Sequence, residues 1–509
     1  MLYSSKHHHL VAAALLGRSL CTLFPQAKIL HFDQTKKGFY CLCKFPHPFD
    51  DQALRMTEEE LKRTIQENLK IETVEMMREN AAVLFEHRGL EPMADEIRKG
   101  SSTIIELVRI EEFYGVCPKP HLSGTRQVGS IKLFWKREGE LIKIEGIARE
   151  TSKDLKQFFK NFAAFTSHEE LGKEADLFFV EKNCCFWAPK GELIREILVQ
   201  WWKSSLRGLG FSIFSSSGAS ITADPRFEYG CQLAEISEKK RDEELSMEGG
   251  LYDLPWATSD RFWWALDEKS ALANVNSCLH FIKKTVNMMA IDCSWIFYNN
   301  LLKSRRCQKN RDLSIEILSQ SLEISGIETF RQNESFQKYS AIEARFTDSL
   351  GREWSGPRIE LRDASGFQID QSMDSFVLVG SVFRSLESLI ALLLESSKGE
   401  LPFWLAPEQV RILPVKQEDV AWAVEIAEEL IENGYRVHCD ADPGSLSEKV
   451  SVANQYKVPY IVVVGKRERE EQAVSVRCSS KGNKASVVSF ELFMEELKKQ
   501  REKAQFPIN

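Results

Sequence analysis

The sequence lacks two patterns that would decide its class at once. It has no C-x-x-C pair of the kind that binds zinc or cycles between redox states, and no apolar run long enough to cross a bilayer. Its twelve cysteines among 509 residues therefore predict free thiols in a reducing cytosol rather than a disulfide framework. We expect a cytoplasmic protein with no membrane segment and no metal site.

The N-terminal stretch superficially resembles a signal peptide. Three of its few polar residues are His7, His8 and His9, which are poor substitutes for the basic residues of such a signal. The Ala/Leu-rich sequence that follows instead predicts a buried helix ending near Gly17.

An excess of positive charge is also missing, because the formal net charge is −7. Any nucleic-acid binding must then rest on a local basic face, and we expect no DNA binding. Candidate faces are Lys303–Arg311 and Lys466–Arg469, although a solvated surface is the simpler interpretation of each. With 43% hydrophobic and 28% charged residues, the chain has the composition of an ordinary soluble protein, and its length predicts three or four domains.

Several elements can be predicted from spacing alone. Thr57 with Glu60 forms a capping-box pattern that predicts a helix over 57–68. Alternation predicts paired strands over 131–135 and 141–147, and helical spacing of apolar residues predicts helices over 190–206 and 376–394. In the last 105 residues, strands and helices alternate, which predicts a mostly parallel sheet covered by helices. The strands are expected at 409–415, 435–440, 458–464 and 473–478, and the helices at 418–432, 446–456 and 490–503.

The segment Leu401–Val415, reading LPFWLAPEQVRILPV, resembles the junction between the catalytic and anticodon-binding domains of class II aminoacyl-tRNA synthetases, most closely threonyl-tRNA synthetase. Further similar segments occur in the family's order at 9–14, 23–25, 38–40, 117–121 and 171–178. The resemblance implies an α+β and α/β multidomain fold: an editing-like α+β domain (1–170), a class II catalytic-like antiparallel sheet domain (171–403) and an α/β anticodon-binding-like domain (404–509). The family's small ubiquitin-like domain has no counterpart.

The resemblance implies an editing site that hydrolyses mischarged seryl-tRNA, and only part of it is matched. His9, Cys117 and His121 correspond to family residues. Ser5 stands where a partner histidine is expected, and Gly115 where an aspartate is expected. His7 or His8 could substitute, and the alternative is that Cys117 and His121 are inherited packing residues.

The synthetase centre departs further from the family, which uses ATP, Mg²⁺ and a zinc ion. The motif 3 arginine falls on Ser388 and a zinc histidine on Val379, while Arg384 lies one helical turn before Ser388. Class II chemistry needs arginines to neutralise the ATP phosphates, so these changes remove functional atoms. We therefore expect no cofactor to be bound.

Motifs 1 and 2 are altered as well. About twenty residues lie between Pro255 and Val275, which leaves no room for motif 2. Glu360 stands at the ATP-side glutamine, where a carboxylate should repel phosphate. Ser217 replaces the class-defining proline of motif 1, so a homodimer is implied by the family and not by this residue. Cys278 and His280 should face different sides of a helix rather than form a metal site.

The C-terminal domain keeps the most of the family pattern, with 459–465 and 474–477 matching it. Its RNA-binding candidates are Arg477, Lys466 and Arg467, whereas Ser479 replaces a second arginine. The favoured hypothesis is a threonyl-tRNA synthetase-like protein that binds tRNA but lacks aminoacylation. The alternatives are a deacylase acting through Cys117 and His121, a divergent active ligase, and a structural protein with no RNA role.

Overall fold

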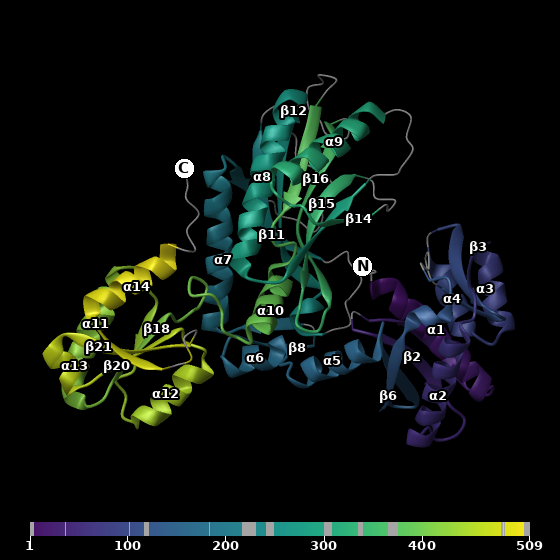
Figure 1. Ribbon diagram of the computed structural model, residues 1–509, viewed down its shortest axis with the longest axis horizontal. Helices are drawn as coiled ribbons and strands as arrows, with labels where there is room; N and C mark the ends of the chain where they lie inside the picture. The colour runs from purple at the N-terminus through teal and green to yellow at the C-terminus, as the bar shows by residue number, and fades with distance from the viewer. Residues whose placement is uncertain are drawn as a thin grey trace. The chain divides into compact units, whose positions relative to one another are not determined.

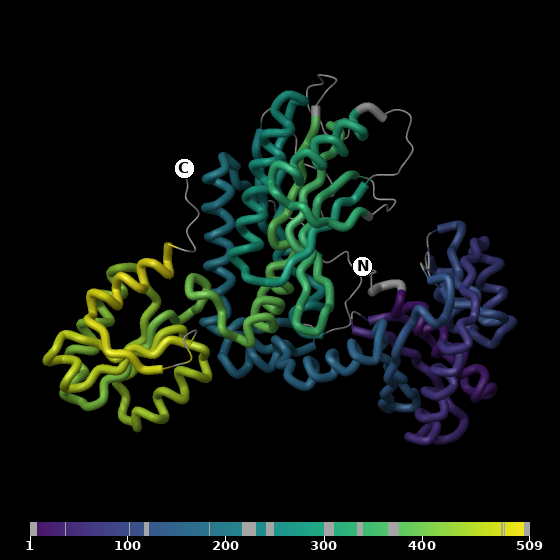
Figure 2. The backbone as a smooth tube through the Cα atoms, viewed as in Figure 1, coloured from purple at the N-terminus to yellow at the C-terminus, as the bar shows by residue number. Residues whose placement is uncertain are grey.

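The computed structural model describes residues 5–35, 37–100, 102–116, 122–182, 184–215, 231–240, 249–299, 308–333, 339–364, 375–479, 482 and 484–502 (Figure 2). These residues form two compact units. One runs to Phe165 and also takes in 350–352, and the other holds the remainder from Thr166 onward (Figure 1). Among the described residues, no helix has the length and apolarity needed to cross a membrane.

The first unit is built on two antiparallel sheets, a four-stranded one in the order β1-β2-β7-β6 and a three-stranded one in the order β3-β4-β5. Apolar side chains of α1 and α2 share one core with both sheets. The strands are β1 (Lys28–Gln34), β2 (Phe39–Lys44), β3 (Ile71–Met77), β4 (Ile104–Ile110), β5 (Phe113–Val116), β6 (Ser130–Glu138) and β7 (Leu141–Arg149). The helices are α1 (Ser5–Leu23), α2 (Asp51–Glu67), α3 (Arg78–His87), α4 (Glu91–Lys99), η1 (Thr125–Val128) and α5 (Ser152–Ala163).

The predicted β6–β7 hairpin is confirmed, but two predicted helix ends are wrong. Helix α1 does not end at Gly17; it continues to Leu23, and a Cβ at position 17 would lie 3.0 Å from the Phe113 ring. The glycine therefore serves close packing rather than a helix end. Helix α2 begins at Asp51 and not at Thr57, because the Asp50 carboxylate accepts a hydrogen bond from Ala53 N at 2.8 Å and caps the helix earlier.

The second unit contains an eight-stranded sheet in the order β10-β11-β12-β17-β16-β15-β13-β14, antiparallel except for its two edge pairs. Its strands are β10 (Ser212–Phe214), β11 (Gln232–Lys240), β12 (Trp256–Asp267), β13 (Cys293–Tyr298), β14 (Phe330–Asn333), β15 (Ser340–Thr347), β16 (Glu353–Asp363) and β17 (Ser375–Ser381). A hairpin of β8 (Phe178–Glu181) and β9 (Cys184–Trp187) follows α6 (His168–Glu174), and η2 (Gly250–Tyr252) precedes β12.

Helices cover one face of this sheet. The large core cluster joins α7 (Pro189–Gly208), α8 (Glu268–Met289), α9 (Gln308–Ile324) and α10 (Leu386–Ser397) to strand residues such as Phe262 and Leu378. The prediction of α7 is confirmed, with Ile194, Leu198 and Trp202 fully buried. The single helix predicted over 376–394 is wrong: the segment forms strand β17 and then α10. A strand buried on both faces has no period of two, so its apolar run cannot be told from helix by spacing.

The buried carboxylate of Asp260 connects the sheet to the helices that cover it. Asp260 on β12 accepts hydrogen bonds from Trp202 Nε1 (2.9 Å), Ser381 Oγ (2.8 Å) and the backbone N–H groups of residues 382, 383 and 384 (2.7, 2.8 and 3.1 Å). These bonds hold the turn between β17 and α10, in which Arg384 adopts φ +58°. A left-handed φ is costly for a non-glycine residue, so the turn needs this support.

The C-terminal part forms a five-stranded sheet in the order β19-β18-β20-β21-β22. Helices α11 and α14 pack on one face and α12 on the other. The predicted mostly parallel sheet is wrong in part, because β21 and β22 run antiparallel to their neighbours. The elements are β18 (Val410–Pro414), η5 (Gln417–Asp419), α11 (Val420–Glu432), β19 (Val437–Cys439), α12 (Leu446–Gln455), β20 (Tyr460–Val464), α13 (Lys466–Glu471), β21 (Ala473–Cys478), β22 (Ala485–Ser489) and α14 (Phe490–Glu502).

The junction before this sheet is held by one arginine. The Arg436 guanidinium donates to the carbonyls of Trp404 and Ala406, both at 2.8 Å, and burial lowers its pKa to about 10. Gln409 donates to the carbonyl of Phe403 at 2.8 Å. The Trp-Leu-Ala-Pro sequence is thus bound to the start of β19 rather than acting as a free linker.

We expect Asp260→Ala to lower the free energy of unfolding by about 3–5 kcal/mol, because it removes the acceptor shared by five donors, of which Trp202 Nε1 and the N–H groups of residues 382 and 383 are buried. Urea denaturation followed by circular dichroism measures the change. Asp442→Ala, which removes a carboxylate in an exposed loop, serves as the control and should change stability by less than about 0.5 kcal/mol. Equal stability of the two variants would contradict a central role for Asp260.

Candidate functional site

The editing-like residues are only partly within the described structure. Cys117 and His121 lie outside the described residues, and so does the side chain of Ser5 in α1. Gly115 lies in β5, where a Cβ would come within 3.0 Å of Ala14 Cβ and 3.2 Å of Phe32 and Val108. An aspartate at this position would place its carboxylate in an apolar core, which is strongly unfavourable.

His9 is buried and neutral. Its side chain lies in the core of the first unit, and its Nε2 accepts a hydrogen bond from the Arg149 guanidinium at 3.3 Å. Burial, and then the nearby charge of Arg149, lower its pKa to about 3. The Arg149 guanidinium packs 4.1 Å from the centre of the Phe158 ring. His9 therefore cannot exchange protons near neutral pH as a general base should.

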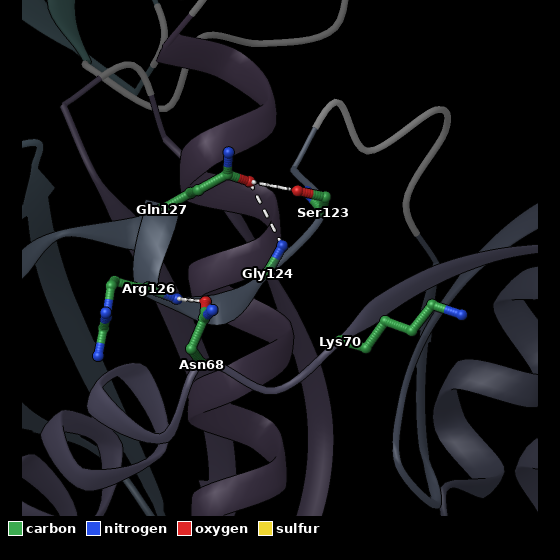
Figure 3. A pocket seen from close by; sticks show the side chains of 6 residues that line it. All are labelled: Asn68, Lys70, Ser123, Gly124, Arg126 and Gln127. Carbon is green, nitrogen blue, oxygen red and sulfur yellow. Dashed lines mark hydrogen bonds between the residues drawn. The ribbon is translucent and has the colours of Figure 1, made fainter.

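The first unit has a polar cavity of about 360 Å³, which the sequence did not predict (Figure 3). Part of its lining follows the segment 117–121 by a few residues in the sequence. The Gln127 side-chain oxygen accepts from the backbone N–H groups of Ser123 (2.7 Å) and Gly124 (3.3 Å), and His8 contacts the carbonyl of Gln127. Lys70 is paired with Glu72 at 2.8 Å. The cavity is lined by Asn68, Lys70, Ser123, Gly124, Arg126 and Gln127.

The face of the eight-stranded sheet opposite the helices carries the positions expected to be altered. Val379 pairs with Trp263 of β12 on one side and Glu360 of β16 on the other. It is buried in an apolar cluster with Trp263, Ala265 and Val377. A valine in this setting offers no metal ligand, and among the described residues no group of three or more His, Cys, Asp or Glu side chains is placed to hold a metal ion.

Glu360 is enclosed by two arginines. Arg358 donates to its Oε1 (Nε 2.9 Å, Nη2 2.8 Å) and Arg362 donates to its Oε2 (Nε 3.0 Å, Nη2 2.8 Å). Burial alone would raise the pKa of Glu360, but the two guanidinium groups outweigh it and lower that pKa. The repulsion of phosphate expected from this carboxylate is therefore offset by its partners, which is a correction to the sequence-based expectation.

The start of α10 shows where the motif 3 position lies. Ser388 is in the first turn of α10, and its N–H donates to the N-cap residue Ser385 at 3.1 Å. Arg384 extends toward β15, with Nη1 3.9 Å from Glu343 Oε2. Glu343 also pairs with Arg345 (2.9 Å) and Arg358 (3.0 Å), so Arg384 belongs to an arginine–glutamate network on this face.

The residues between Pro255 and Val275, where the sequence leaves no room for motif 2, form one strand and the start of a helix. A single strand, β12, pairs with β11 and β17 along its length, and α8 begins directly at Glu268. Cys278 of α8 is buried with a pKa raised to about 12 by burial, while His280 is exposed. The prediction that these two face different sides of the helix is confirmed. Ser217 lies outside the described residues.

The RNA-binding candidates of the C-terminal domain are accessible to different degrees. Lys466 and Arg467 are about three-quarters exposed on α13, but each pairs within its own helix, with Glu470 (3.8 Å) and Glu471 (3.1 Å). Arg477 is half-buried on β21 opposite Ile461, and its Nε makes no hydrogen bond with any described residue. Arg477 is thus the least compensated of the three.

We expect acid to destabilise the protein through His9. Because its folded pKa lies far below the ordinary 6.5, the unfolded chain takes up a proton first as pH falls through 6.5. The contribution amounts to about 2 kcal/mol of lost stability between pH 7 and pH 5. Urea denaturation at both pH values should show a smaller loss for His9→Gln. The control His280→Gln should keep the full loss, and equal losses in all three proteins would contradict the burial argument.

Comparison with known proteins agrees with this geometry. Residues 409–500 match the anticodon binding domain family. The chain is 26% identical to a threonine–tRNA ligase of Clostridioides difficile, over 94% of this chain and 85% of that protein. It is 23% identical to a threonine–tRNA ligase of Acidithiobacillus ferrooxidans, over 91% of this chain and 83% of that protein.

Among solved structures, the RNA binding domain of threonyl-tRNA synthetase from Cryptosporidium parvum superimposes with a TM-score of 0.58 at 17% identity. The match covers 66% of this chain and 98% of that chain. The predicted fold class is confirmed: a mixed α+β multidomain protein with a large antiparallel class II-like sheet and a C-terminal α/β anticodon-binding domain. The chain is similar in sequence to these threonine–tRNA ligases over nearly its whole length.

Proposed function

We propose that this chain is a member of the threonyl-tRNA synthetase family that binds tRNA through its C-terminal domain, residues 404–509, and does not aminoacylate it. The proposal of RNA binding rests mainly on the match of residues 409–500 to the anticodon binding domain family. Arg477 supports it, since its half-buried side chain lies on β21 within the matched residues, and a guanidinium group is suited to bind an RNA phosphate.

The loss of aminoacylation is supported by independent features of the sheet face. Strand β12 and the start of helix α8 occupy the whole interval between Pro255 and Val275 in which motif 2 is expected, so no loop is inserted there. Val379 is packed against Trp263 and Val377, where a zinc ligand is expected. These losses remove both the charge that would stabilise the reacting phosphate and the metal that would select threonine.

Four arginines of this face are engaged by the protein's own carboxylates. Arg358 and Arg362 both pair with Glu360, and Arg345 and Arg384 approach Glu343. A nucleotide phosphate binding there would first have to break partly buried ion pairs, each with several aligned donors. We therefore assign the face a structural role.

The first test is a gel shift with bulk tRNA at two salt concentrations, repeated with a panel of individual tRNAs. We expect binding that weakens as salt rises, because phosphate contacts release counterions. Arg477→Ala should weaken binding several-fold and reduce the salt dependence by about one unit of slope. The control Arg207→Ala removes an exposed arginine of α7 and should bind as the wild type does. Absence of tRNA binding by the wild type would contradict the proposed function.

The second test is threonine-dependent exchange between ATP and pyrophosphate. We expect no exchange above the enzyme-free background, because the charge stabilisation that adenylate formation needs is missing. An active threonine–tRNA ligase assayed in parallel controls for the reagents. Robust exchange by this protein would instead establish the divergent-ligase hypothesis.

A further inference from the structure

A surface of the first unit combines exposed aromatic rings with lysines that make no ion pair with a described residue. It lies where α5 packs against β6 and β7; Figure 1 labels α5 and β6. We call it the Phe-Lys patch, and it consists of Phe134, Phe159, Phe162, Lys153, Lys156 and Lys160.

The aromatic part of the Phe-Lys patch is a continuous set of rings. Phe134 of β6 meets Phe159 edge-on at 5.7 Å between ring centres. Phe159 contacts the buried Phe158 at 5.6 Å, and Phe158 stacks on Phe162 at 5.9 Å with 19° between the planes. Phe134 is 43% exposed and Phe162 is 45% exposed. The inner rings thus hold two outer rings rigidly at the surface.

The lysines occupy a stripe on the side of α5 away from the buried Phe158, with Lys156 one helical turn before Phe159. Lys153, Lys156 and Lys160 are spaced at i, i+3 and i+7, which places them on one side of the helix. All three are exposed, and none makes an ion pair with a described residue. Helix α5 carries one acidic residue, Asp154, whose carboxylate accepts a hydrogen bond from Thr151 at 2.6 Å. The helix therefore has a formal charge of +2, in a chain whose net charge is −7.

Other lysines near Phe134 differ from these three. Lys132 pairs with Glu58 at 3.0 Å, and Lys136 pairs with Glu138 at 3.1 Å. Their charges are compensated by the protein itself. The positive charge that an anionic partner could neutralise is consequently concentrated along α5, beside the rings.

We propose that the Phe-Lys patch binds unpaired nucleotides of an RNA strand, with bases stacking on Phe134 and Phe162 and phosphates contacting the three lysines. Stacking on a fixed ring suits any unpaired base, whereas paired bases within a duplex have their faces covered by their neighbours. A lysine stripe one helix face away from the rings suits the backbone of the same strand. The positive charge argues against an ordinary protein partner with a neutral apolar face.

The proposal rests on the proposed function only in taking RNA as the ligand, and it concerns a surface outside the C-terminal domain. The full-length protein would be titrated against a labelled single-stranded RNA of about twelve nucleotides, a duplex of the same length and bulk tRNA. Each titration would be repeated over a series of salt concentrations.

The triple variant Lys153→Ala, Lys156→Ala, Lys160→Ala should bind the single strand at least tenfold more weakly. The slope of log affinity against log salt should also shrink by about two, since each lost phosphate contact on a single strand removes about 0.7. The matched control Lys28→Ala, Lys99→Ala, Lys269→Ala removes the same charge from three other exposed positions. It should leave both affinity and slope unchanged.

The double variant Phe134→Ala, Phe162→Ala tests the stacking separately. It should weaken single-strand binding about tenfold or more with no change in salt slope, and it should leave duplex binding unchanged. Both rings are nearly half exposed, so circular dichroism should show an unchanged fold. Unchanged single-strand affinity in either the lysine or the phenylalanine variant overturns the proposal.

The outcomes also separate this inference from the proposed function. If Arg477→Ala weakens tRNA binding while the patch variants bind single strands as the wild type does, the proposed function stands and the patch inference fails. If the wild type binds single strands through the patch but does not bind tRNA, the proposed function fails alone. A wild type that binds none of the three RNAs overturns both.

Discussion

The arrangement of the second unit depends on the buried carboxylate of Asp260. Five donors from α7 and from the β17–α10 turn converge on its two oxygens, so one side chain sets the spacing of a helix, a strand and a turn. The turn includes Arg384 in the left-handed region, a conformation that needs such support. After the turn, the Glu387 side chain of α10 accepts a hydrogen bond from Thr258 N at 2.9 Å. Thr258 lies on β12, the same strand as Asp260. The scaffold around the sheet is therefore held by bonds on its helix-covered face.

Under the proposed function, this division explains how a synthetase-like fold can persist while residues on the opposite face change. Core bonds and the large apolar cluster lie under the helices, whereas Val379, Trp263 and Glu360 lie on the other side of the same strands. Alternate residues of a strand point to opposite faces, so one face can be substituted without disturbing the packing of the other. On the opposite face, Val379 makes apolar contacts and the Glu360 carboxylate is paired with two arginines. Under the proposed function, stability and catalysis are separable because they depend on different sides of one sheet.

The basic residues also fall into two groups: those paired with carboxylates and those without a carboxylate partner among the described residues. Lys466 and Arg467 stand out in the sequence, yet the helix that carries them also carries Glu470 and Glu471 one turn later. The lysines of α5 attract less notice in the sequence because they are spread over eight residues among phenylalanines. Folding places them on one exposed stripe of the helix that also carries Phe162, without carboxylate partners among the described residues. Exposure and pairing, rather than the density of basic residues, mark the surface suited to a polyanion.

The sequence by itself determined the elements whose periodicity is unambiguous: the β6–β7 hairpin, helix α7 and strand β21 all lie where spacing predicts them. The junction at 401–415 also predicted similarity to threonyl-tRNA synthetases, which the comparisons bear out; the assignment of Val379, Ser388 and Glu360 as altered positions stays a prediction. Spacing failed at 376–394, where a strand and a helix share one apolar run, and at α2, where Asp50 caps the helix before Thr57. Only the tertiary structure decided that His9 is neutral beside Arg149, that Glu360 is enclosed by two arginines and that Asp260 holds a turn more than 120 residues away. Secondary structure follows from neighbours along the chain, whereas ionisation and hydrogen bonding depend on neighbours in space, which only folding brings together.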